Sequence, residues 1–279
     1  LGRPVSFLDA DATREQTGMD IYSGALLDQD GGTIHPLDYL RGLLQGVRRR
    51  GGTAHENSCV DRVDRDGRLW RLTMRSGASV MATTVLQCTN AFTSGVASRI
   101  GRSTVPLRVY QIATTPADPT TVKRIAPDGR PVGDTRQNLF TYRLDRDNRL
   151  ISGGMAAIPF GAFDRLGRAV AKRLSEELAL PQAVTPEVVW TGVAAMTPDF
   201  LPRLYQLGEN WFGGIGCNGR GIAMTAQLGR VLARAALGES LETLPIPTRP
   251  LRPLPFHQFT PMVASAALVQ ARLKDMLAK

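Results

Sequence analysis

The sequence is poor in the residues that bind metals or form disulfide bridges. Its three cysteines, Cys59, Cys88 and Cys217, lie far apart and form no C-x-x-C pair, which argues against both a disulfide framework and a zinc site. The three histidines are equally scattered, so we expect no metal centre. Scattered cysteines favour a reducing compartment, and a cytoplasmic location is therefore expected.

Long apolar runs are absent as well. No stretch of 18 apolar residues occurs, so no transmembrane helix is expected. The first residue is Leu1 rather than Met, and no basic segment followed by an apolar core marks a signal peptide. We interpret the start of the sequence as a truncation rather than as a targeting segment. An apolar content of 43% and a charged content of 21% fit an ordinary globular protein with a sizeable core.

Acidic residues are outnumbered by basic ones. The chain has 34 lysines and arginines against 25 aspartates and glutamates, a net charge of +9, which raises nucleic-acid binding as a hypothesis. The basic residues are spread along the chain, however, and their one cluster, Arg48–Arg50, ends a predicted helix where cations are favourable. We therefore favour surface and helix-end arginines and expect no nucleic-acid partner.

The most informative segment that is present runs from Trp211 to Ser240. An apolar strand leads into five glycines and then into a helix with apolar residues at helical spacing, which Gly238 ends. The turn matches G-x-G-x-x-G over Gly214–Gly219, but a dinucleotide fingerprint needs a second parallel strand after the helix. Five prolines between 245 and 255 exclude that strand. The sequence therefore predicts an anion or cofactor seat here, but not the pyrophosphate loop of a dinucleotide fold.

The remaining pattern predicts two kinds of unit. Pro36 and Gly51 bound a helix over 36–50, and a second helix is expected over 164–178. A last helix should follow Pro261, with Thr260 as its N-cap. Alternation of apolar and polar residues predicts strands over 53–60, 69–74 and 79–88, and longer strands over 105–115, 139–144, 149–154 and 187–194.

The order of these segments resembles a known family. The segments that carry the resemblance are GGTIHPLDYLRGL (31–43), VLQCTNAFT (85–93), PLRVYQIATT (106–115), FTYRLDRDNRLISGG (140–154), WTGVAAMTPDFLP (190–202) and GGIGCNGRGIAMT (213–225). Together they resemble FAD-dependent oxidoreductases of the glycine/D-amino acid oxidase (DAO) family, and especially its γ-glutamylputrescine oxidase-like members. The resemblance covers about residues 5 to 240 in the order of the family.

The resemblance implies an α/β (α+β) fold with two interleaved domains. An incomplete FAD/NAD(P)-binding Rossmann-like domain would comprise 1–100 and 203–245, an antiparallel substrate domain 101–202, and a C-terminal tail with a helix 246–279. Members of the family begin with a βαβ unit whose G-x-G-x-x-G seats the FAD pyrophosphate. This chain starts past that unit, so we expect it to be N-terminally truncated and to lack the primary cofactor clamp.

The same comparison implies noncovalent FAD and positions that contact it. The Gly-rich turn, Gly213–Gly221, would approach the flavin ring. Val60 would contact the adenine, and the turn after residue 88 would lie near the diphosphate. For Val60, a core strand position is an equal alternative. The implied cofactor contacts are Val60, Thr89, Asn90, Ala91, Gly216, Cys217, Asn218, Gly219, Arg220, Gly221 and Ile222. Noncovalent binding is expected because no cysteine stands near Thr197, where sarcosine oxidases attach flavin.

The chemistry that the family implies is hydride transfer from the carbon bearing an amine to flavin N5, giving an imine that water hydrolyses. Arg143 would pair with a substrate carboxylate, with a strand-surface arginine as the alternative. Tyr142 and Tyr110 would line the same pocket, with core packing as their alternative. Amino-acid oxidases of the family carry G-L-R-P where this chain has Gly192–Ala195, which favours a larger secondary amine or amide-bearing amine over a small α-amino acid. No single catalytic residue is assigned.

Two alternatives stand beside an amine oxidoreductase. The first is a non-catalytic remnant, because the chain lacks the pyrophosphate loop. This alternative predicts that the chain takes up no flavin and that it aggregates through unpaired sheet edges. The charge alone motivates the second, a basic nucleic-acid-binding protein whose binding falls steeply with salt. The exact amine, the choice between oxidase and dehydrogenase, and the oligomeric state stay open.

Overall fold

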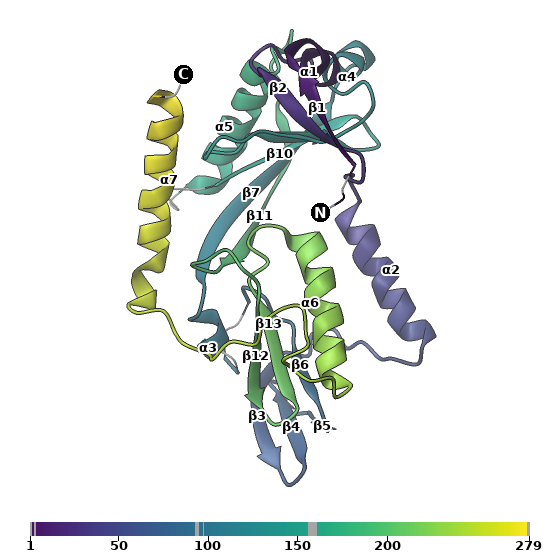
Figure 1. Ribbon diagram of the computed structural model, residues 1–279, viewed down its shortest axis with the longest axis vertical. Coiled ribbons are helices and arrows are strands. Elements are labelled where there is room, and N and C mark those ends of the chain that lie inside the picture. Colours follow the sequence, from purple (N-terminus) through teal and green to yellow (C-terminus); the bar gives the residue numbers. More distant parts are fainter. Residues whose placement is uncertain (1, 3, 93–94, 97, 156–160, 278–279) are drawn as a thin grey trace. The chain divides into compact units, whose positions relative to one another are not determined.

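The chain forms two units, and each is assembled from stretches that lie far apart in the sequence. The first unit contains Leu1–Ile34, Arg108–Gly192 and Ala264–Lys279, and the second contains His35–Leu107 and Val193–Val263. The computed structural model describes residues 2, 4–92, 95–96, 98–155 and 161–277, and Figure 1 shows its ribbon. The units are thus interleaved along the chain.

A five-stranded sheet forms the centre of the first unit. Its strands lie in the order β11, β7, β10, β9, β8, and β10 pairs antiparallel with both β7 and β9. The strands are β7 (Val105–Pro116), β8 (Val132–Gly133), β9 (Thr141–Leu144), β10 (Arg149–Met155) and β11 (Pro186–Met196). The division between the units falls inside β7 and β11.

Helices cover one face of this sheet. Ile112, Ser152 and Tyr142 lie side by side across β7, β10 and β9, and all three are buried. The apolar stripe of α5 (Ala162–Glu177) packs on that face together with α4 (Pro119–Ile125). The buried cluster consists of Met19, Ile112, Ile125, Ala126, Phe140, Tyr142, Leu150, Val170, Ala171, Leu174 and Leu178.

A hairpin that carries a short helix completes this core. Strand β1 (Val5–Asp9) pairs antiparallel with β2 (Gly24–Asp28), and α1 (Ala10–Thr17) lies between them in the sequence. Asp9 caps α1 by accepting a backbone N–H of its first turn at 2.9 Å. Gly18 ends the helix at φ 65°, and a Cβ there would come within 2.6 Å of the Arg124 carbonyl oxygen. Glycine is therefore required where α1 meets α4.

The hydroxyl of Tyr142 joins three parts of this core. It lies 2.8 Å from the carbonyl oxygens of both Thr17 and Ile125, which share its single proton, and the residue is 1% exposed. Burial, and to a smaller extent Tyr22, raises the pKa of Tyr142. The buried, neutral hydroxyl of Tyr142 therefore stabilises the fold fully below the unfolded-state pKa of about 10. That stabilisation is lost as the pH rises from there toward the higher pKa of the folded state.

We expect Tyr142→Phe to lower the free energy of unfolding by about 1–3 kcal/mol, because two buried carbonyl oxygens lose their donor. Urea unfolding followed by circular dichroism measures this change. Tyr39→Phe, at a tyrosine that is 39% exposed on α2, is the control and should change it by less than about 0.5 kcal/mol. An equal effect of the two substitutions would contradict the core role of Tyr142.

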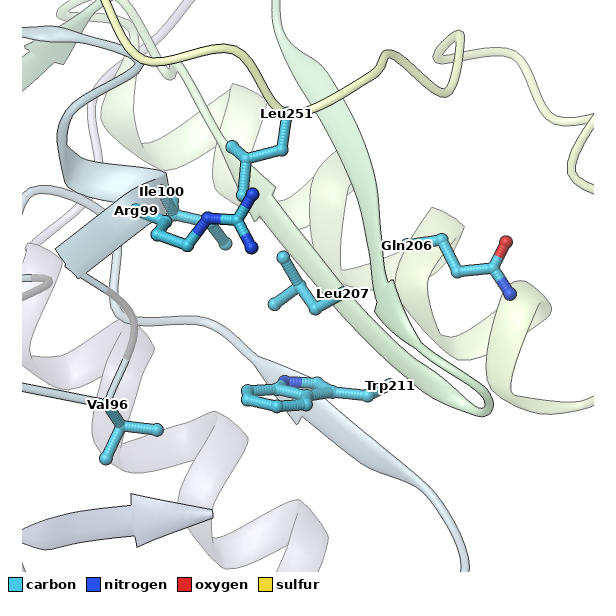
Figure 2. A pocket seen from close by; sticks show the side chains of 7 residues that line it. All are labelled: Val96, Arg99, Ile100, Gln206, Leu207, Trp211 and Leu251. Atoms are coloured by element: carbon cyan, nitrogen blue, oxygen red, sulfur yellow. The ribbon is translucent and has the colours of Figure 1, made fainter. Parts of the chain in front are cut away.

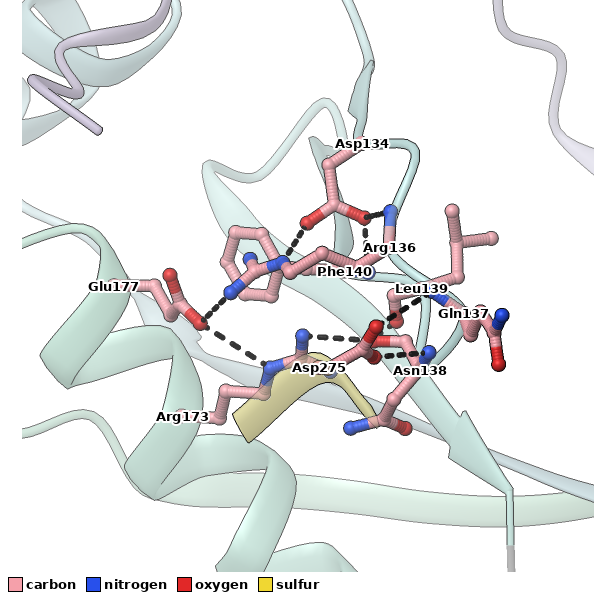
Figure 3. A network of polar contacts seen from close by, with 9 residues as sticks. All are labelled: Asp134, Arg136, Gln137, Asn138, Leu139, Phe140, Arg173, Glu177 and Asp275. Atoms are coloured by element: carbon pink, nitrogen blue, oxygen red, sulfur yellow. Dashed lines mark hydrogen bonds and ion pairs between the residues drawn. The ribbon is translucent and has the colours of Figure 1, made fainter. Parts of the chain in front are cut away.

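A polar network holds the loop between β8 and β9 (Figure 3). The guanidinium of Arg136 donates to the carboxylates of Asp134 and Glu177. Arg173 of α5 donates to the carbonyl oxygens of residues 138 and 139, and both guanidinium groups lie over the Phe140 ring, at 5.6 and 5.0 Å from its centroid. The side chain of Asp134 is only 3% exposed, so its charge depends on these donors.

The last helix, α7 (Thr260–Leu277), is fixed to the same loop. The carboxylate of Asp275 accepts the backbone N–H groups of Gln137 and Asn138, at 3.1 and 2.6 Å. Arg272, one turn earlier, donates to the Met155 carbonyl oxygen at 2.8 Å. These contacts attach the C-terminal part of the chain to the first unit.

The second unit is built around a mixed three-stranded sheet. Its order is β12, β13, β6, with β12 (Arg203–Gly208) antiparallel and β6 (Val85–Gln87) parallel to β13 (Trp211–Ile215). Helix α6 (Gly221–Ala236) packs on one face. The cluster on that side consists of Leu204, Phe212, Leu228, Val231, Leu232, Ala235, Leu244 and Ile246. A second cluster contains Ile100, Ala195, Tyr205 and Ile215.

A separate antiparallel meander belongs to the same unit. It consists of β3 (Val60–Asp66), β4 (Leu69–Met74) and β5 (Ser79–Ala82). Trp70 of β4 contacts Trp211 of β13 edge to face, with ring centroids 5.1 Å apart, and its indole N–H donates to the Glu209 carbonyl oxygen at 2.9 Å. The remaining elements are α2 (Pro36–Arg49), α3 (Ser98–Gly101) and the 3-10 turn η1 (His257–Phe259).

The structure confirms the predicted helices and most of the predicted strands. The strand expected over 53–60 is wrong, since β3 begins at Val60, and Asn57 before it has a φ of 55° that interrupts an extended backbone. The strand expected over 79–88 is two strands, β5 and β6, which belong to different sheets. Thr260 begins α7 itself rather than capping it, because η1 leads directly into the helix.

The unit boundaries also differ from the expected domains. Residues 1–34 belong to the unit with the five-stranded sheet, since the Tyr142 hydroxyl and the Met19 side chain tie the first hairpin to that core. The segment expected as a tail is divided between the two units. Among the described helices, none combines the length and apolar character that crossing a bilayer requires.

Candidate functional site

The Gly-rich turn after β13 has a backbone that few residues can adopt. Gly216, Asn218 and Gly219 have φ values of 88°, 51° and 78°, in the left-handed region that favours glycine and asparagine. A Cβ at Gly216 would come within 2.7 Å of the Thr197 side chain. The glycines therefore allow the chain to reverse tightly between β13 and α6.

The side chain of Asn218 fastens this turn to the end of β11. Its Oδ1 accepts the backbone N–H of Thr197 at 2.8 Å and the Thr197 hydroxyl at 3.1 Å, and its Nδ2 donates to the Gly216 carbonyl oxygen at 2.8 Å. The Thr197 hydroxyl also lies 2.9 Å from the Leu201 carbonyl oxygen. Sequence reasoning missed Thr197 as a support of the turn, although it lies in a segment that carried the family resemblance.

We expect Asn218→Gly to lower the free energy of unfolding by about 1–3 kcal/mol, because three side-chain hydrogen bonds are lost while the positive φ stays permitted. Asn210→Gly is the matched control. Asn210 also has a positive φ, of 56°, and its side chain makes no hydrogen bond to the described residues. Chemical unfolding of both variants should separate the two effects, and equal stabilities would show that the Asn218 bonds contribute nothing.

The turn after β6 lies against the Gly-rich turn. Strands β6 and β13 are parallel neighbours, with Gly213 opposite Gln87, so their carboxyl ends lie at the same edge of the sheet. Asn90, with φ 46°, donates from Nδ2 to the Cys217 sulfur at 3.6 Å. Ligands of open α/β sheets bind at the carboxyl ends of such strands. The structure thus brings together the Thr89–Ala91 turn and the Gly-rich turn.

Space for a ligand exists on the outer side of the Gly-rich turn. A Cβ placed on Gly219 or on Gly221 would meet no atom within 4 Å among the described residues. The first turn of α6 has no side-chain cap, so its backbone N–H groups stay available and carry the positive end of the helix dipole. Arg220 and Ile222 are exposed or nearly so beside them. This arrangement fits a flat or anionic group that approaches the backbone closely.

Val60 stands apart from these turns. It is the first residue of β3 rather than the last residue of a strand, and it pairs with Met74 in the meander. No hydrogen bond among the described residues joins it to the two turns. Contact of Val60 with an adenine stays a prediction.

The three substrate-site candidates lie on two faces of the five-stranded sheet. Arg143 shares a row with Ile151 and Ala113, on the face opposite to Tyr142. Its guanidinium makes no hydrogen bond or ion pair with the described residues, which leaves it available for an anion. Tyr142 is buried with its hydroxyl engaged, and Tyr110 is 5% exposed and packs on Leu166 of α5. The geometry favours core packing for both tyrosines.

Side chains of the metal-binding types are scattered in the described part of the chain. No three side chains of the metal-binding types His, Cys, Asp and Glu lie close enough together in that part of the chain to hold a metal ion. All three cysteines are free, and only Cys217 is buried. Ala194 is 8% exposed and Ala195 is fully buried, so these two positions are packed into the protein.

Comparison with known proteins gives this geometry its context. The family model described as "DAO: FAD dependent oxidoreductase" matches residues 1–235. The chain is 29% identical to gamma-glutamylputrescine oxidoreductase of Escherichia coli over 85% of this chain and 56% of that protein. It is also 29% identical to the probable oxidoreductase OrdL of Haemophilus influenzae, over 83% and 53%. The chain therefore spans about half the length of the curated relatives it matches.

Solved structures show the same fold. L-proline dehydrogenase from P. horikoshii aligns with a TM-score of 0.71 at 17% identity, covering 88% of this chain and 67% of that one. Glycine oxidase from Geobacillus kaustophilus aligns with a TM-score of 0.69 at 17% identity, covering 86% and 64%. These likenesses confirm the predicted fold class, a Rossmann-like α/β part interleaved with an antiparallel sheet.

Proposed function

Because the chain belongs to the DAO family of FAD-dependent oxidoreductases, we propose that it contributes to an enzyme that oxidises a C–N bond of an amine or amino-acid-like substrate. The observation that carries the proposal is the meeting of the Thr89–Ala91 turn and the Gly-rich turn at the carboxyl ends of β6 and β13. Open space beside Gly219 and Gly221 adjoins them.

The residues at this edge fit a noncovalently bound FAD. Glycines at 219 and 221 leave room where a Cβ would block close approach, and the uncapped start of α6 offers backbone donors to an anionic ring. Thr89, Asn90 and Ala91 would hold the cofactor from the second turn. Bound FAD supplies a hydride acceptor for the carbon that carries the amine nitrogen.

The protein's own groups would position the two reactants. The α6 N-terminus favours negative charge on the cofactor side by about 0.3–1 kcal/mol. Arg143, half-buried and without a partner among the described residues, would pair with a carboxylate of the substrate, since a guanidinium binds carboxylate through two parallel hydrogen bonds. The buried alanines at 194 and 195 support a substrate other than a small α-amino acid.

A flavin titration tests the proposal. Purified chain is mixed with increasing FAD, and the visible spectrum and the quenching of flavin fluorescence are recorded, followed by denaturation and filtration. We expect saturable one-to-one binding and complete release of FAD on denaturation. Anaerobic addition of γ-glutamylputrescine should then bleach the flavin bands faster than glycine or L-proline does.

The competing hypothesis, a non-catalytic remnant of such an enzyme, makes the opposite prediction. It expects no flavin uptake at any FAD concentration and no amine-dependent bleaching. Saturable uptake with bleaching would exclude it, and the absence of both would refute our proposal. A cytoplasmic location stays part of the proposal and is supported by the three free cysteines.

Arg143→Gln gives a sharper test of the substrate site. In the FAD-loaded protein we expect the dissociation constant of a carboxylate-bearing amine to rise at least about tenfold, which corresponds to about 1.4 kcal/mol. Perturbation of the flavin spectrum on titration measures it. Arg146→Gln, at an exposed position in the β9–β10 turn, makes the same charge change and should leave the constant unaltered. Equal shifts in both variants would rule out a specific role for Arg143.

A further inference from the structure

The second unit contains a cavity that the proposed flavin site does not use. Its volume is about 340 Å³, within the range of small-molecule pockets. The seven residues that line it are Val96, Arg99, Ile100, Gln206, Leu207, Trp211 and Leu251 (Figure 2). None of them belongs to the Gly-rich turn or to the Thr89–Ala91 turn.

Two polar groups at this cavity, on Arg99 and Trp211, are hydrogen-bond donors without acceptors among the described residues. Arg99, on the short helix α3, makes no hydrogen bond or ion pair with any described residue. Figure 2 shows its guanidinium beside Leu251, with the Leu207 side chain between it and the indole of Trp211. The indole Nε1 of Trp211 is itself buried without an acceptor, and an unsatisfied buried donor of this kind calls for an explanation. Both groups suit an anionic or carbonyl oxygen.

Apart from the exposed amide of Gln206, which points away from the other side chains in Figure 2, the remaining lining is apolar. Ile100 is 1% exposed, and the side chains of Leu207, Leu251 and Val96 stand around the same space (Figure 2). The indole ring of Trp211 forms a further flat apolar wall. A ligand that fills this cavity must therefore combine one acceptor group with a hydrocarbon body.

We propose that this cavity binds a small organic carboxylate with an apolar body of about five carbons. One guanidinium matches one planar carboxylate in two parallel hydrogen bonds. A phosphate dianion would need more cationic or N–H partners than the lining supplies. The hydrocarbon body would displace water from Leu207, Trp211 and Leu251. The site is distinct from the amine site proposed at Arg143 and goes beyond the proposed oxidoreductase function.

Isothermal titration of the full chain with sodium hexanoate at constant ionic strength tests the proposal. We expect saturable binding at one site per chain. Arg99→Gln should weaken it at least about tenfold. Trp211→Phe, which keeps an aromatic wall but removes the N–H, should weaken it by a smaller factor. Hexan-1-ol and inorganic phosphate should each bind more weakly than hexanoate, because the first lacks the charge and the second lacks the apolar body.

Arg102→Gln is the matched control, since Arg102 is exposed one residue beyond α3 and does not line this cavity. Hexanoate binding should be unchanged in Arg102→Gln and in Arg143→Gln. The proposal is overturned if no saturable binding occurs, if Arg99→Gln and Arg102→Gln weaken it equally, if phosphate binds as well as hexanoate, or if Arg143→Gln alone abolishes it. Flavin plays no part in this titration, so its failure is separate from any failure of the proposed function.

Discussion

Gly219→Val is expected to weaken FAD binding at least about 100-fold, which corresponds to about 2.7 kcal/mol. The reason is steric. A Cβ at this position would meet open space in the described structure, which is the space that we assign to the flavin ring, and two methyl groups would fill it. Quenching of flavin fluorescence during titration of the variant with FAD measures the loss.

Backbone strain complicates this substitution, because Gly219 has a φ of 78° and valine there costs about 1–3 kcal/mol. Gly238→Val is the matched control at the other end of α6. Gly238 has a φ of 88°, and a Cβ there would also meet nothing within 4 Å, so the strain is similar while the position is remote from the turn. The two variants should lose similar stability. Equal FAD affinities would show that Gly219 does not adjoin the cofactor.

The second large effect concerns stability. Arg136→Met should lower the free energy of unfolding by about 3–5 kcal/mol, because it leaves the carboxylate of Asp134 buried without its cation and leaves Glu177 with Arg173, at 3.5 Å, in place of two cations. The side chains of Asp134 and Glu177 are 3% and 12% exposed. Burial lowers the pKa of Arg136, but its hydrogen bonds with Glu177 and Asp134 more than offset this and raise it, so the guanidinium is charged at any accessible pH.

An exposed ion pair in the same unit gives the control for Arg136→Met. Arg130 lies 3.6 Å from Asp128, and both side chains are 48% exposed. Arg130→Met removes the same charge and should cost less than about 1 kcal/mol. Urea unfolding midpoints of the two variants decide the matter. A similar loss in both would mean that the network around Phe140 contributes no more than a surface pair.

Local signals made much of the fold predictable. Pro36 and Gly51 predicted the two ends of α2, and the glycines after β13 predicted the start of α6. The first hairpin was not predicted, because β1 and β2 are short and the strands take their stability from pairing with each other and from the core around Tyr142. The break between β5 and β6 was missed for a similar reason. Only the tertiary structure assigns the two strands to different sheets.

The candidate site was predictable where the backbone itself carries the geometry. The glycines between 213 and 221 predicted a turn that leads from a strand into a helix, and the structure has this turn between β13 and α6. Side-chain roles were harder to predict. Alternation along β9 places Arg143 and Tyr142 on opposite faces, but which face is buried depends on α5, which lies later in the sequence. Thr197 supports the turn through Asn218, a pairing across the chain that no local pattern encodes.

The pairing of β6 with β13 has a consequence for how the protein folds. Val85 and Trp211 are neighbours in the sheet, yet most of the five-stranded sheet is encoded between them. Closing so long a loop in an unfolded chain is entropically costly and slow. In the first unit, however, β7 and β11 are adjacent strands. The chain enters the five-stranded sheet through β7 and leaves it through β11, so the folded sheet holds these two strands next to each other. The effective loop is then short, and we therefore expect β6 and β13 to pair after the antiparallel sheet has formed.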